Sequence, residues 1–187
     1  MRSLARPFFM NNASYSYKQD NTYTIGIIVD QSIIIRKHII VKRILSFITS
    51  KQFSLYHTVN IIIALRNSYE CSIARNVIEK RLLHPNLRLF LLLSGHQINS
   101  HNKARLNAST TKYSDIIAST EGLSVIQTTF TSTFFRKSLE EISKNCDLII
   151  YRLICDRHIR LLQSLIHNNN RTIHMLDIAY NNIINIS

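Results

Sequence analysis

CDLIIYRLICDRHIRLL, residues 146–162, is the stretch that decides the fold. Within it, an apolar run rich in β-branched and aromatic residues (148–154) predicts a buried strand. The run ends on Asp156-Arg157-His158, and open α/β sheets bind ligands at the ends of their strands. The triplet therefore has two interpretations. In one, Asp156 and His158 hold a metal ion; in the other, Asp156 caps the next helix while Arg157 and His158 face solvent.

Segments before and after this stretch alternate between strand and helix patterns. Buried strands are predicted at residues 59–65 and 87–93, with an extended segment at 123–126. Helices are predicted from Ser72 to the His84-Pro85 break, at 103–117, at about 128–143 and at about 160–165. This alternation predicts an α/β fold, a mostly parallel sheet with flanking helices.

The patterning divides the chain into three regions. Residues 1–57 form a leader or stem region of unclear structure, with a strand expected at 23–29 and a helix or a pair of strands across 33–48. Residues 58–166 form the α/β domain, and residues 167–187 form a weakly patterned tail with one short apolar element at 173–178. Four basic residues interrupt the apolar stretch 33–48, which leaves a membrane-surface helix open.

Composition limits the classes of function. Hydrophobic residues make up 45% of the 187, enough for a folded core, and 23 basic against 11 acidic residues give a net charge of +12. This charge suggests a nucleic-acid partner, although the basic residues form no run of five or more. The three cysteines form no CxxC pair, and a glycine-rich phosphate loop and a GxSxG elbow are both missing.

Several segments of residues 59–162 stand in the order and spacing of one known family. The strand VNIIIAL precedes a basic helix that carries Arg75, and the strand LRLFLLLSG ends in Gly95. The sequence YSDI, residues 113–116, follows, and Asp156 stands ten residues beyond Cys146. In these features the chain resembles the β-1,3-galactosyltransferase family, Golgi enzymes in which an aspartate at this position begins a D-x-D metal motif.

The resemblance implies a hexosyltransferase with a glycosyltransferase A-like, nucleotide-sugar-binding fold. Such an enzyme transfers galactose or N-acetylhexosamine from a UDP-sugar to a hydroxyl of a glycan acceptor, at the Golgi membrane or in the secretory lumen. It implies Mn²⁺ on the diphosphate, with Asp156 and His158 as metal ligands. It also implies that Arg75 and Arg157 contact the substrate, because a guanidinium can bind a diphosphate directly. No catalytic base is assigned.

The chain also departs from the family pattern. His158 stands where the second aspartate of the motif is expected, the tryptophan of the first helix is missing, and residues 128–133 read TTFTST instead of a polar N-L-T-x-K-T run. The segments that supply acceptor recognition and the catalytic base find no counterpart after Leu162, so a truncated domain is expected. Two alternatives therefore stay open, a non-catalytic truncated relative and a basic nucleic-acid-binding α/β domain.

Overall fold

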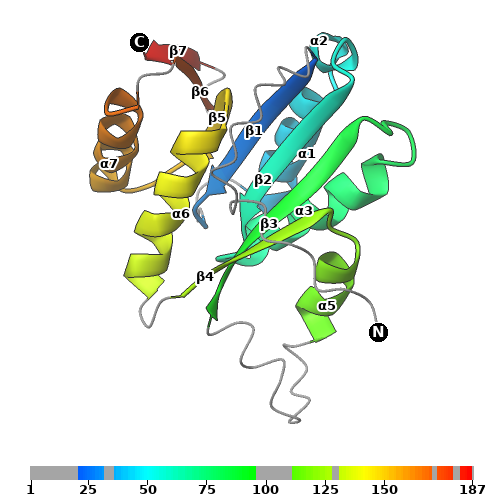
Figure 1. The fold of residues 1–187 in the computed structure, drawn as a ribbon, viewed down its shortest axis with the longest axis horizontal. Helices are drawn as coiled ribbons and strands as arrows, with labels where there is room; N and C mark the ends of the chain where they lie inside the picture. The colour runs from blue at the N-terminus through cyan, green and yellow to red at the C-terminus, as the bar shows by residue number, and fades with distance from the viewer. Residues whose placement is uncertain are drawn as a thin grey trace, which may run out of the picture.

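The computed structural model describes residues 21–31, 36–95, 111–127, 131–169, 172–178 and 182–186. The strands of this part of the chain form one sheet of seven (Figure 1). They are β1 (Thr22–Val29), β2 (Thr58–Ala64), β3 (Leu87–Ser94), β4 (Gly122–Ile126), β5 (Leu148–Arg152), β6 (Ile173–Asp177) and β7 (Asn182–Ile186).

The strand order in this sheet is β4-β3-β2-β1-β5-β6-β7. Strand β1 is central and pairs in parallel with β2 on one side and with β5 on the other. The pairs β2–β3, β3–β4 and β5–β6 are also parallel, and β7 runs antiparallel to β6. The predicted α/β fold with a mostly parallel sheet is therefore confirmed.

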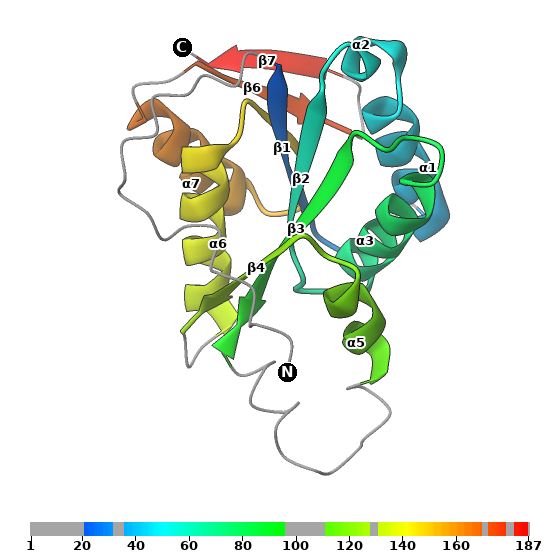
Figure 2. The same ribbon diagram turned by 45° about the vertical axis from the view of Figure 1, so that its right-hand side comes forward.

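Helices cover both faces of the sheet (Figure 2). Three of them, α1 (Lys37–Ile48), α3 (Ser68–Lys80) and α5 (Thr111–Ala118), lie on one face, and the short α2 (Lys51–Ser54) follows α1. On the other face lie α6 (Thr131–Asn145) and α7 (Asp156–His167). Each face thus has its own apolar core, and the sheet separates the two cores.

The central strands are apolar at consecutive positions because helices cover them on both sides. Ile61, Ile62 and Ile63 of β2 are all fully buried, and successive side chains of a strand point to opposite faces. Ile61 and Ile63 belong to the core beneath α1 and α3, whereas Ile62 belongs to the core beneath α6 and α7. The β-branched shape of isoleucine favours the extended backbone that this arrangement needs.

Gly26 of β1 allows helix α6 to pack closely on the sheet. A Cβ atom at this position would overlap Cγ2 of Ile142 and would lie 2.9 Å from Sγ of Cys146. Both of those side chains are fully buried. The absence of a side chain at Gly26 therefore sets how near α6 approaches the central strand.

The three predicted regions do not match the sheet. Strand β1, from the predicted leader region 1–57, is the central strand, and its Ile25 pairs with Ile61 of β2 and with Leu148 of β5. Strand β6, from the predicted tail 167–187, continues the same sheet beyond β5. The division at residues 58 and 166 is therefore corrected, because main-chain pairing with β1 and β6 completes the sheet.

Several helix ends differ from the sequence-based expectation. Helix α3 begins at Ser68, four residues before Ser72, because Asn67 and not Ser72 is its N-cap. Helix α7 begins at Asp156 and not near residue 160, with Cys155 as its N-cap. The predicted helix at 103–117 is described from Thr111 onward as α5, since residues 96–110 lie outside the described part of the chain, as do residues 128–130 of the next predicted helix.

Within the described ranges, every helix falls short of the length and apolar character needed to cross a membrane.

Candidate functional site

The strand order reverses at β1, and this position is where ligands bind in open α/β sheets. After β1 the chain builds β2, β3 and β4 outward on one side, and it then returns to place β5 on the other side of β1. Connections that leave in opposite directions open a crevice at the carboxyl ends of the two strands. The residues that follow β1, β2 and β5 are therefore the first candidates for a site.

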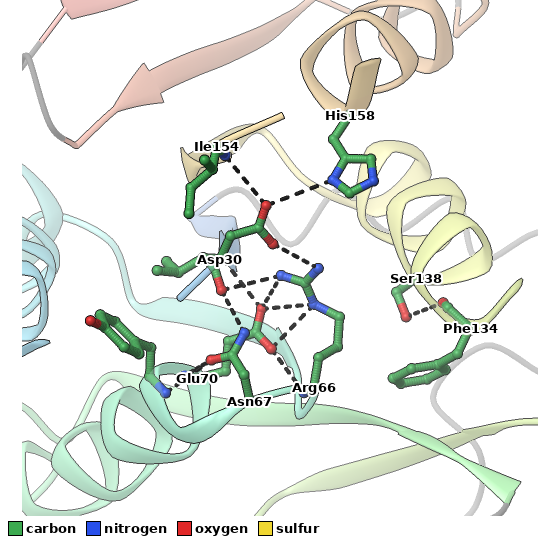
Figure 3. A network of polar contacts seen from close by, with 10 residues as sticks. Asp30, Arg66, Asn67, Glu70, Phe134, Ser138, Ile154 and His158 are labelled. Atoms are coloured by element: carbon green, nitrogen blue, oxygen red, sulfur yellow. Dashed lines mark hydrogen bonds and ion pairs between the residues drawn. The ribbon is translucent and has the colours of Figure 1, made fainter. Parts of the chain in front are cut away.

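Asp30 joins the ends of all three strands (Figure 3). Its main-chain N–H donates to the carbonyl of Arg152 in β5, at 2.8 Å. Its carboxylate lies 3.4 Å from Nη1 of Arg66, which follows β2, and it accepts from the N–H of Ile154, after β5, at 3.4 Å. One carboxylate thus fixes the relative positions of the three strand ends.

Arg66 and Glu70 form a buried ion pair beside Asp30. Glu70, in the first turn of α3, has no exposed surface, and its Oε1 accepts from Nη2 of Arg66 at 2.5 Å and from Nε at 3.0 Å. Main-chain N–H groups of Val29 and Arg66 also donate to this carboxylate, at 3.2 and 2.8 Å. Burial raises the pKa of Glu70, and the Arg66 guanidinium and these N–H donors oppose that rise.

Asn67 connects the same cluster to the start of α3. Its side-chain oxygen accepts from the N–H groups of Tyr69 and Glu70, at 2.9 and 3.1 Å, which satisfies two donors of the first turn. Its side-chain nitrogen donates to the carbonyl of Val29 at 2.7 Å. The N-cap therefore also fastens α3 to the end of β1.

Two aromatic rings cover the outer side of this cluster. The Phe135 ring, from α6, lies 4.6 Å from the guanidinium carbon of Arg66, within the range of a cation–π contact. The His158 ring, from α7, packs on Phe135 with 4.3 Å between ring centroids. Nδ1 of His158 lies 3.7 Å from Oδ2 of Asp30 and makes no hydrogen bond within the described residues.

The structure separates the two predicted metal ligands. Asp156 and His158 are the first and third residues of α7, and residues two apart on a helix point about 200° apart. Asp156 is exposed, whereas His158 is half-buried and faces Asp30. Arg157, between them, is exposed.

The donors in the described part of the chain do not fit a Mn²⁺ site as they lie. No three His, Cys, Asp or Glu side chains come together there in a group that could hold an ion. Manganese prefers several oxygen ligands, and His158 is shielded by Phe135 on one side. No chemical step is therefore derived through this metal.

Arg75, the other predicted substrate contact, does not join the cluster. It is exposed on α3, on the face of the sheet opposite to α7. Arg75 and Arg157 consequently lie in different layers of the molecule.

Asp30, Arg66, Asn67, Glu70 and Phe135 were not among the predicted site residues. Asp30 and Arg66 carry a recognisable signal, because each is the first charged residue after an apolar strand. Asp30 was overlooked because its strand was assigned to a leader region. Glu70 and Phe135 join the site through helix packing, which has no signal in local sequence.

Comparison of the chain with models of known protein families and with curated proteins finds no match in either set.

Proposed function

We propose that the protein is a hexosyltransferase-like protein that binds a UDP-sugar at the carboxyl ends of β1, β2 and β5. The observation that carries the proposal is the cluster of Asp30, Arg66 and His158 at the point where the strand order reverses. The order of segments over residues 59–162, which resembles the β-1,3-galactosyltransferases, supplies the class of ligand.

In this proposal Arg157 binds the diphosphate. It is exposed in the first turn of α7, where the helix dipole also favours an anion. Arg66 has a different role, since its guanidinium is occupied by Glu70 and Asp30 and is 11% exposed. Arg66 therefore positions the strand ends and does not contact the ligand.

Asp30 and His158 are proposed to line the site on the side away from Arg157. The Asp30 carboxylate is 21% exposed and retains acceptor capacity that suits a sugar hydroxyl. Its Oδ2 also lies 3.7 Å from Nδ1 of His158. By the same resemblance, the proposed acceptor is a glycan hydroxyl and the proposed location is the Golgi.

The first test is calorimetry of UDP-galactose and UDP, with and without Mn²⁺, on the full chain. Binding is expected, and the Arg157→Ala variant is expected to weaken it about tenfold, because a hydrogen-bonded charge contact contributes about 1.5–3 kcal/mol. Arg160→Ala is the matched control, since Arg160 is an exposed arginine one turn further along α7. It should change the affinity less than about twofold.

Two results would overturn this proposal. One is the absence of any binding heat for UDP-galactose both with and without Mn²⁺. The other is an equal loss of affinity in Arg157→Ala and Arg160→Ala. That result would mean that the net charge of the protein, and not a specific contact with Arg157, determines the affinity for the diphosphate.

Binding and transfer are separate questions. A glycosyltransfer assay with UDP-galactose and glycan acceptors distinguishes an active hexosyltransferase from a non-catalytic relative that retains the sugar-nucleotide site. We assign no catalytic base within the described residues, because none of them has been placed against an acceptor.

A further inference from the structure

A cavity of about 710 Å³ lies between helices α1 and α3, on the face of the sheet opposite to α7. The cavity is lined by residues from Lys37, where α1 begins, to Thr49, just after it ends. It therefore follows that helix for about 18 Å. Its lining residues are Lys37, His38, Val41, Lys42, Leu45, Ser46, Thr49, Ser72, Asn76 and Lys80. It is therefore an elongated groove and not a compact pocket.

The groove is basic throughout. Lys37 and Lys42 come from α1 and Lys80 from the last turn of α3, and none of the described lining residues is Asp or Glu. Among the described residues, none of the ion pairs involves any of these three lysines. Helix α1 itself contains no acidic residue. Within the described part of the chain, the groove consequently carries a positive charge that no carboxylate of its lining offsets.

A second basic cavity, of about 700 Å³, lies along the other side of α1. It is lined by Arg43 and by residues near the end of β6, and it shares His38, Lys42 and Ser46 with the first cavity. These three residues are spaced four apart and are all exposed, so they form a ridge along α1 between the two grooves. The two grooves and the ridge make one continuous basic surface.

We propose that this surface binds single-stranded nucleic acid through its phosphodiester backbone. The cations are distributed along the length of α1, which fits a chain of phosphates better than a single phosphate group. The hydroxyl groups of Ser46 and Ser72 supply further hydrogen bonds to phosphate oxygens. Val41 and Leu45 also line the first groove but are buried, so the contacts to the nucleic acid come from its basic and polar groups.

Other occupants fit these observations less well. A small phosphorylated ligand would fill one cavity and leave the second groove and the shared ridge without a role. Residues 1–20 of the chain carry Arg2, Arg6 and Lys18 against Asp20 alone, so their charge does not complement the groove. The proposal does not rest on UDP-sugar binding, because α7 and α1 lie on opposite faces of the sheet.

The test is fluorescence anisotropy with a labelled oligothymidylate and a labelled oligouridylate of about twelve nucleotides, over a range of salt concentrations. The variant Lys37→Gln, Lys42→Gln and Lys80→Gln is expected to lower the affinity at least tenfold. It is also expected to reduce the slope of log K against log salt by about 2, since each phosphate contact to a single strand contributes about 0.7.

The matched control replaces Lys51, Lys137 and Lys144 with Gln, which removes the same charge from exposed positions outside the groove. Equal losses in the two triple variants would overturn the proposal, as would the absence of salt-dependent binding by the unchanged protein. Tight binding of inorganic polyphosphate without binding of either oligonucleotide would also overturn it. Circular dichroism confirms that both variants remain folded.

Discussion

At the scale of single residues, the Arg66–Glu70 ion pair is the part of the site in which a buried charge depends most on its partners. Glu70 has no exposed surface, and its carboxylate depends on Arg66 and on two main-chain N–H groups to replace water. A buried carboxylate without its cation is strongly unfavourable, although a complete buried pair is not necessarily stabilising. Because Glu70 is buried, the fold therefore needs Arg66 to compensate the charge of its carboxylate.

Arg66→Ala is predicted to lower the free energy of unfolding by about 3–5 kcal/mol, because it leaves Glu70 buried without a cation. Urea denaturation followed by circular dichroism measures the change. The double variant Arg66→Ala with Glu70→Gln should recover part of the loss, since the neutral amide has a smaller desolvation cost.

Arg136→Ala is the control for this prediction. Arg136 pairs with Glu140 at the same i,i+4 spacing, but its side chain is 67% exposed. An exposed pair of this kind contributes about 0.3–0.5 kcal/mol. A loss of similar size in Arg66→Ala and Arg136→Ala would show that the buried carboxylate does not need its partner.

At the scale of secondary-structure elements, the strands were more predictable than the helix ends. Runs such as VNIIIAL and LRLFLLL are short and apolar at consecutive positions, and together with the turn residues beside them they indicate strands buried on both faces. The start of α3 was misplaced because both Asn67 and Ser72 can cap a helix. Asn67 is the N-cap in the fold because its side chain also bonds to Val29, a contact across 38 positions of sequence.

The site was predictable only in part for a similar reason. The triplet Asp156-Arg157-His158 was visible because a charged cluster follows an apolar run within one segment. The partners of His158, Asp30 and Phe135, come from segments far away in the sequence and meet it only through sheet pairing and helix packing. Local patterns indicate that a strand end is charged, but they do not indicate which strand ends are neighbours.

The packing of α6 on β1 gives a prediction at this scale. Gly26→Ala is expected to lower the free energy of unfolding by about 1–3 kcal/mol, because the new methyl group overlaps Ile142 and presses on Cys146. Thermal or urea denaturation measures the effect. Combining it with Ile142→Ala removes the overlapping atom, so the double variant should lose less stability than the sum of the two single variants. Strict additivity would contradict the close approach of α6.

At the scale of the whole molecule, one sheet joins strands from before residue 58 and from after residue 166. The strand order was beyond the reach of sequence patterns, because each pair of neighbours is chosen by non-local contacts. The consequence is that β1, contributed by residues before 58, lies between β2 and β5 and is hydrogen-bonded to both. Ile25, Ile27 and Val29 of this strand are fully buried.

A fragment of residues 58–166 is therefore predicted not to fold, although it contains the whole α/β domain that the sequence patterns predict. The fragment lacks both β1 and β6, so β2 loses one neighbouring strand and β5 loses both. The core also loses Ile25 and Ile27, which are fully buried. The fragment should show no cooperative urea transition, and its amide hydrogens should exchange without protection. Addition of residues 21–57 to the fragment should restore at least part of the transition. A cooperative transition in the fragment alone would mean that β2 and β5 pair directly, and the site built around Asp30 would then not be the place where strands from two parts of the chain meet.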